Sequence, residues 1–181
     1  SGGVAASGGS LSNLMALVMA RNIAGLESDP NAVFFASDDS HVSLSKALRI
    51  MGLKRDSLQK IPTDDNGKLD ITCLLSSYKK IKSEGKKCFA VVATAGTTVR
   101  GAIDPISNIA QFCQKENVWL HVDGAIGGIY GFSAITSKLL EGICSADSIT
   151  VNPQKLLGIS KTSSLLLVSN KRHLSSTFST G

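Results

Sequence analysis

Two kinds of hydrophobic pattern alternate along the 181 residues of this chain. Short apolar runs, each too short for a buried helix, predict strands in the core. These runs cover residues 33–36, 89–93, 118–122, 148–151 and 164–168. Elsewhere apolar residues recur at helical spacing, which predicts helices over residues 11–23, 42–51, 71–81 and 105–113.

The alternation of the two patterns indicates an α/β fold. Because the runs are continuously apolar, the strands are expected to be buried on both faces, as in a parallel sheet covered by helices. We therefore predict one three-layer α/β/α domain with a mostly parallel sheet over residues 1–181. Ligands of such sheets bind beyond the carboxyl ends of the strands, so the polar residues that follow each run are the candidate functional residues.

The composition fits a packed globular domain, with 43% hydrophobic and 18% charged residues. The longest apolar run, residues 14–20, is far shorter than the roughly 20 residues of a membrane helix. No secretory signal is readable at the N-terminus, and we expect a cytoplasmic protein without a membrane partner.

The net charge of +5 is concentrated in a lysine cluster that has only Tyr78 nearby to stack on bases. This favours a solvated helix face over a nucleic-acid site. The cluster consists of Lys79, Lys80, Lys82, Lys86 and Lys87.

The cysteines lie far apart and form no C-x-x-C pair, so no metal site is expected and buried, inert thiols are predicted. They are Cys73, Cys88, Cys113 and Cys144.

Three segments carry residues suited to chemistry. The Gly-rich stretch Ser7–Asn13 precedes a predicted helix, whose free N–H groups could bind an anion such as a phosphate. Asp123 follows one predicted strand and Lys155 follows the next, so a carboxylate and a lysine are expected at the same edge of the sheet. The Gly-rich stretch alone is weak evidence, because it matches neither common nucleotide-binding motif.

Taken together, five motifs in order make the chain resemble the group II pyridoxal-phosphate-dependent amino-acid decarboxylases. That family includes the aromatic-amino-acid, glutamate and cysteine-sulfinate decarboxylases. The motifs are Ser-Gly-Gly-Ser-Leu-Ser-Asn (7–13), Asp-Ser-His-Val-Ser (39–43), Ala-Gly-Thr-Thr (95–98) with Ala-Ile-Asp-Pro (102–105), Trp-Leu-His-Val-Asp (119–123), and the segment 146–155 that ends in Asn-Pro-Gln-Lys.

The resemblance implies the cofactor-binding large domain of the aspartate-aminotransferase-like fold (fold type I). It implies pyridoxal 5′-phosphate as cofactor, decarboxylation of an L-amino acid as activity, and a homodimer as the assembly. The chain would cover somewhat under half of a family member, without its N-terminal segment and C-terminal small domain. Alone, it is expected to be inactive.

The resemblance also assigns roles to individual residues. Lys155 would hold the cofactor as a Schiff base, with Lys161 as the alternative lysine. Asp123 would keep the pyridine nitrogen protonated, and His41 would stack on the cofactor ring. Further cofactor contacts are implied for Gly9, Ser10 and Asn152 at the phosphate, for Thr98, and for Ala125 on the ring face opposite the histidine. His121 is interpreted as a structural residue.

One motif departs from the family pattern. Gln154-Lys155-Leu156 stands where the family most often has His-Lys-Trp. Gln154 can still donate a hydrogen bond toward a phosphate, but it cannot titrate near neutral pH, which puts any proton role of that histidine in doubt.

Alternative functions remain open at this point. Other lyases and transaminases use the same lysine, carboxylate and phosphate loop, and the chain could also be an inactive cofactor-domain fragment. A serine acyl-enzyme is suggested by Ser43-x-x-Lys46 together with Lys161-Thr162-Ser163. That function is disfavoured because no Ser-Asp-Asn lies between the two motifs and a parallel sheet does not suit that family.

Overall fold

The computed structural model describes residues 1–161 and 163–179, and within them seven strands form one sheet. The strands are β1 (Gly2–Ala6), β2 (Ala32–Ser37), β3 (Leu58–Ile61), β4 (Lys87–Thr94), β5 (Trp119–Gly124), β6 (Ser148–Val151) and β7 (Ser164–Val168). The α-helices are α1 (Gly9–Ile23), α2 (Ser43–Ile50), α3 (Ile71–Ser83), α4 (Ile106–Glu116), α5 (Pro153–Leu156) and α6 (Arg172–Phe178). Short 3-10 helices occur at Arg55–Ser57, Gly127–Phe132, Ser137–Leu140 and Ile143–Ser145.

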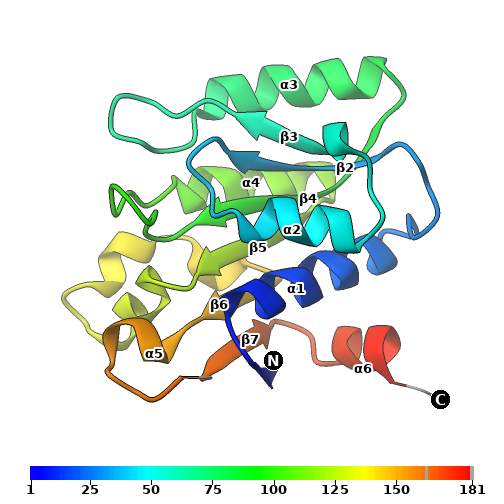
Figure 1. Ribbon diagram of the computed structural model, residues 1–181. Coiled ribbons are helices and arrows are strands. Elements are labelled where there is room, and N and C mark those ends of the chain that lie inside the picture. Colours follow the sequence, from blue (N-terminus) through cyan, green and yellow to red (C-terminus); the bar gives the residue numbers. More distant parts are fainter. Residues whose placement is uncertain (162, 180–181) are drawn as a thin grey trace.

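The sheet is parallel at its centre and antiparallel at one end (Figure 1). Its strand order is β1-β7-β6-β5-β4-β2-β3. The pairs among β3, β2, β4, β5 and β6 are parallel, whereas β7 runs antiparallel to both β6 and β1. The prediction of a mostly parallel sheet is confirmed.

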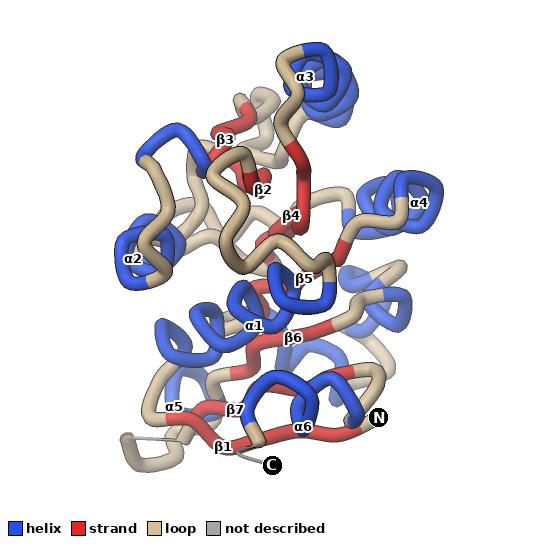
Figure 2. Tube along the Cα trace, turned by 90° about the vertical axis from the view of Figure 1, so that its right-hand side faces the viewer, coloured by secondary structure: helices blue, strands red, loops and turns tan. Residues whose placement is uncertain are grey.

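Helices cover both faces of the sheet, which confirms the α/β fold. In Figure 2, α1 and α2 lie on one side of the strands and α3 and α4 on the other. Each side has its own apolar core: Phe34 and Val92 pack with α1 and α2, whereas Phe35 and Val91 pack with α3 and α4. Neighbouring residues of β2 and β4 thus face opposite cores, because successive side chains of a strand point to opposite faces.

Two strands and two α-helices were not predicted from the sequence: β1, β3, α5 and α6. β1 contains two glycines, β3 and α5 have only four residues each, and α6 is mostly polar, so none has a clear hydrophobic period. The prediction that β7 is buried on both faces is wrong. Its burial alternates, with Leu165 and Leu167 exposed, as expected for an antiparallel strand with one open face.

The expectation of buried cysteines holds only in part. Cys113 is buried, and burial raises the pKa of its thiol far above the ordinary range. Cys144 is exposed, because it lies in the short 3-10 helix Ile143–Ser145 at the surface. Among the described residues, no cluster of His, Cys, Asp and Glu could hold a metal ion, and no helix is long and apolar enough to span a bilayer.

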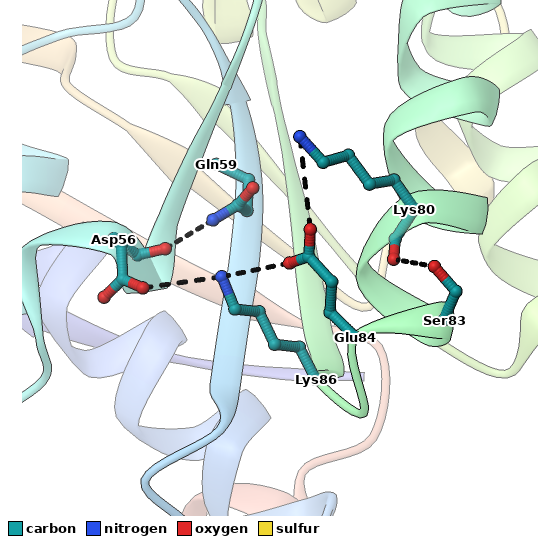
Figure 3. A network of polar contacts seen from close by, with 6 residues as sticks. All are labelled: Asp56, Gln59, Lys80, Ser83, Glu84 and Lys86. Atoms are coloured by element: carbon teal, nitrogen blue, oxygen red, sulfur yellow. Dashed lines mark hydrogen bonds and ion pairs between the residues drawn. The ribbon is translucent and has the colours of Figure 1, made fainter.

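The lysine cluster lies on the surface among carboxylates. Lys86 lies between Asp56 and Glu84 (Figure 3), with its Nζ 3.4 Å from a carboxylate oxygen of each, and Lys80 Nζ is 4.0 Å from Glu84 Oε1. Lys82 and Lys87 pair with Glu116 and Asp29. Such exposed pairs contribute little to stability because water and salt screen them. The arrangement fits the interpretation of a solvated surface.

Asp104 fixes the loop that connects β4 to α4. It is 2% exposed, and its two carboxylate oxygens accept hydrogen bonds from the backbone N–H groups of Leu69 (2.8 Å) and Thr94 (2.7 Å). Burial raises the pKa of Asp104 to about 6, although both N–H groups act in the opposite direction. Asp104 therefore ties the end of β4 to the chain segment that precedes α3.

We predict that Asp104→Ala lowers the free energy of unfolding by about 2–4 kcal/mol, because two buried N–H groups lose their partner. Urea unfolding of the full chain at neutral pH measures this. Asp65→Ala, at an exposed position, is the control and should leave the midpoint unchanged. An equal midpoint for Asp104→Ala would contradict the role of Asp104.

Candidate active site

A cavity of about 230 Å³ lies at the carboxyl ends of β4, β5 and β6. It brings together all the cofactor-site residues singled out from the sequence: Gly9, Ser10, His41, Thr98, Asp123, Ala125, Asn152, Gln154 and Lys155. Lys161, the alternative lysine, is not in its lining. A larger hollow of about 540 Å³ lies near the opposite ends of β4 and β5, but no lysine lines it.

The sequence interpretation assigned no individual role to part of the cavity wall, although four of these residues lie in its motifs. Gly8, Asn13, Thr94, Gly96, Thr97 and Ile126 also line the cavity. Thr94 ends β4 and pairs with Asp123 of β5 in the parallel register, so both side chains point to the same face of the sheet. A signal for Thr94 existed, because it is the polar residue that follows the apolar run 89–93.

The Gly-rich stretch forms the start of α1 and one wall of the cavity. The carbonyl oxygen of Gly8 accepts hydrogen bonds from the N–H groups of Leu11 and Ser12, so the helix begins directly at the cavity. A Cβ atom at Gly9 would lie 3.3 Å from Asn152 Nδ2 and 3.4 Å from the Ala125 Cβ. Glycine lets the helix start approach the ends of β5 and β6, where its first N–H groups can bind an anion.

Asp123 is a buried carboxylate at the end of β5. It is 4% exposed; its Oδ2 accepts a hydrogen bond from Asn13 Nδ2 (2.8 Å) and its Oδ1 accepts one from the Ala125 N–H (3.2 Å). Within the described ranges, no lysine, arginine or histidine forms an ion pair with it. A buried carboxylate normally has a charged partner. The cavity therefore suits a ligand that brings a cationic hydrogen-bond donor.

His121 lies under the cavity rather than in its lining. The ring is fully buried, with Nδ1 2.9 Å from Ser148 Oγ and Nε2 3.0 Å from Asn13 Oδ1. Burial lowers the pKa of His121 to about 4, although the nearby charge of Asp123 opposes the shift. The imidazole is therefore neutral at pH 7, in keeping with a structural role.

Lys155 and its neighbours form another part of the cavity wall. Lys155 lies in α5, a single turn that starts with Pro153 directly after β6. Its side chain is exposed, and its amine has no ion-pair partner in the described part of the chain. Gln154 Oε1 accepts a hydrogen bond from the Ser163 N–H (3.3 Å), which leaves the Nε2 group as a donor for an anion.

His41 reaches the cavity from the loop between β2 and α2. Its Nδ1 accepts a hydrogen bond from the Ser43 N–H (3.2 Å), so in the neutral ring the proton is on Nε2. Ser43 itself is buried, and its Oγ accepts a hydrogen bond from Asn13 Nδ2 (3.0 Å), whereas Lys46 is exposed. This arrangement does not support the serine acyl-enzyme, in which Ser43 would be the nucleophile. Thr162 of the second motif is outside the described residues.

Comparison with known proteins assigns the chain to a family. The model of the pyridoxal-dependent decarboxylase conserved domain matches residues 1–180. The chain belongs to the pyridoxal-dependent decarboxylase family.

The names of individual relatives refer to different amino acids. The chain is 40% identical to the aromatic-L-amino-acid decarboxylase of Bacillus atrophaeus over 97% of its residues, and 38% identical to the cysteine sulfinic acid decarboxylase of Rattus norvegicus over 95%. The crystal structure of Oryza sativa TDC with PLP and tryptamine aligns with a TM-score of 0.93 at 28% identity, over 99% of this chain and 39% of that chain. The chain spans 37% and 36% of the lengths of the two sequence relatives.

We predict that the buried His121 makes this decarboxylase-family chain less stable in acid. The unfolded chain binds a proton at His121 below about pH 6.5, whereas the folded chain does so only below about pH 4. The stabilisation is complete above pH 6.5 and is lost as the pH falls toward 4, by an amount on the order of 3 kcal/mol.

Urea unfolding of the full chain and of His121→Gln between pH 4 and 7 checks this prediction. Asp104 has the opposite pH dependence, because its raised pKa favours the fold as the pH falls below about 6. It is present in both proteins, so its effect cancels in the difference. Parallel profiles for the two proteins would show that His121 is not held neutral by the fold.

Proposed function

We propose that the chain is the cofactor-binding part of a pyridoxal-phosphate-dependent L-amino-acid decarboxylase. One observation carries the proposal: a single cavity combines an accessible lysine amine, a buried carboxylate without a cationic partner, and the start of a helix. Pyridoxal 5′-phosphate has a group complementary to each, namely an aldehyde, a pyridine nitrogen that can carry a proton, and a phosphate. Family membership supports the same cofactor.

The residues divide into three groups around the proposed cofactor. Gly9 and Ser10 at the start of α1 would bind its phosphate through their N–H groups, with Asn152 and Gln154 as side-chain donors. Lys155 would hold it by a covalent bond from the amine until the substrate amine replaces that bond. His41 would stack on one face of the ring and Ala125 would pack on the other, with Thr98 as a further contact.

When bound, pyridoxal phosphate supplies an electron sink for the bond that breaks at the substrate α-carbon. The role of Asp123 follows from its charge and burial. A carboxylate favours a proton on a nearby nitrogen, and the low polarity around a residue that is 4% exposed strengthens this effect. Asp123 would therefore keep the proton on the pyridine nitrogen, which makes the ring a better sink.

Finer features of the whole protein are also proposed. We infer fold type I architecture, with residues 1–181 as part of the large domain, and a cytoplasmic homodimer that acts on an amino acid. Unpaired cysteines support a reducing compartment.

We predict that the protein containing this chain binds pyridoxal phosphate covalently at Lys155. Borohydride reduction followed by peptide mass analysis should place the cofactor mass on the peptide that contains Lys155. The label should disappear in Lys155→Arg and persist in Lys161→Arg, the matched control. Label on Lys161 alone, or none in the unsubstituted protein, would refute the assignment.

Asp123→Asn is expected to keep part of the cofactor binding and to lower turnover by about 100-fold, because the pyridine nitrogen loses the group that favours its proton. The exposed Asp65→Asn is the control and should leave turnover unchanged. Carbon dioxide release from a panel of amino acids gives the rate, and formation of a keto acid instead would indicate a transaminase. Near-normal turnover of Asp123→Asn would leave Asp123 with a structural role only.

A further inference from the structure

A buried asparagine in α1 holds the Asp123 carboxylate from below. Asn13 is 1% exposed and makes every hydrogen bond that its amide can make. Its Nδ2 donates to Asp123 Oδ2 (2.8 Å) and to Ser43 Oγ (3.0 Å). Its Oδ1 accepts from Thr150 Oγ1 (2.7 Å) and from His121 Nε2 (3.0 Å). Asparagine is a poor helix former, so its place in the interior of α1 calls for a reason.

The register of the strands places this network at the cavity wall, where Asn13 and Asp123 line the cavity and their partners lie behind them. His121 and Asp123 are two residues apart on β5, and they pair with Ser148 and Thr150 of β6. All four side chains therefore point to the face of the sheet that α1 covers. Asn13 is the residue of α1 that connects both strands to the cavity wall.

The partners of Asn13 determine which way its amide points. Trp119 Nε1 donates to Ser148 Oγ (2.9 Å), and the Ser148 hydroxyl can then donate to His121 Nδ1. Because the imidazole is neutral, its proton is on Nε2 and is donated to Asn13 Oδ1. A flipped amide would place its oxygen against the Asp123 carboxylate and its NH₂ against two donors. Only the observed orientation satisfies all of these groups.

We infer that Asn13 is a positioning residue: oriented by His121 and Thr150, it holds Asp123 as a charged acceptor for a protonated ring nitrogen. The inference rests on the proposed function and deepens it. Asn13 donates to Oδ2 while the Ala125 N–H donates to Oδ1, so each oxygen has a hydrogen-bond donor and the orientation of the carboxylate is fixed. The remaining lone pairs of Asp123 are available to a ligand in the cavity.

The test compares two ligands of the cofactor-free protein: pyridoxal phosphate, and an analogue in which carbon replaces the ring nitrogen. Both carry the aldehyde and the phosphate, so the ratio of their dissociation constants isolates the contact between Asp123 and the nitrogen. The unsubstituted protein should prefer pyridoxal phosphate. Asn13→Ala should reduce this preference about 10-fold, the effect of losing one charge-assisted hydrogen bond.

Matched variants separate positioning from packing. Ser12→Ala removes a neighbouring buried hydroxyl that has no hydrogen-bond partner in the described structure, and it should leave the preference unchanged. His121→Gln keeps a donor toward Asn13 and should retain most of the preference, whereas His121→Leu should lose it. Thr150→Val, which has nearly the same shape, should reduce it about threefold, and it replaces Asn13→Ala if that variant does not fold.

The outcomes distinguish this inference from the proposed function. If Asn13→Ala, or Thr150→Val in its place, weakens both ligands equally, Asn13 only packs and the inference is wrong, while the cofactor proposal stands. An unchanged ratio of the two dissociation constants in these variants would likewise show that the inference is wrong. If the unsubstituted protein binds neither ligand, both the inference and the proposed function are overturned.

Discussion

The negative charge of Asp123, removed from water without a cation to balance it, is the constraint on which the site depends. Its compensation comes from neutral donors: an amide of α1 on one oxygen and a backbone N–H on the other. The oxygen of the Asn13 amide needs hydrogen-bond donors in turn, and one of them is His121. The polar network therefore extends through His121 to Ser148 and to Trp119 at the far end of β5. The apolar core thus contains a buried hydrogen-bond network between α1 and the two central strands β5 and β6.

The parallel pairing of β4, β5 and β6 turns this constraint into a site. Because the three strands end at one edge, Thr94, Asp123 and Asn152 meet there although they are distant in sequence. The start of α1 covers this edge closely, since Gly9 has no side chain to hold it away from Asn152 and Ala125. Asp104 keeps the loop after β4 in place through two backbone N–H groups.

Much of this arrangement can be predicted from the sequence, for physical reasons. The central strands are apolar on both faces and give a clear pattern, so residues at their ends, such as Asp123 and Lys155, can be assigned to one edge. β7 could not be oriented, because antiparallel pairing depends on the connection and not on composition. The role of Asn13 could not be predicted either. Asp123, His121 and Thr150, three of its four partners, lie on β5 and β6, more than 100 residues away, and its spacing in α1 is compatible with a solvent-facing position.

The pairing of β1 with β7 has a consequence for the order in which the chain folds. β1 is at the end of the sheet, and its one strand partner in the described structure is β7, from residue Ser164 onward. During synthesis the parallel strands can assemble first, but β1 has no strand to pair with until the ribosome has released β7. Gly8, in the turn from β1 into α1, lines the cavity, so the pairing of β1 with β7 anchors the segment that leads into this wall. Leu166 and Val168 of β7 also belong to the core that α1 covers, so the release of β7 completes this core and provides the partner of β1 at the same stage.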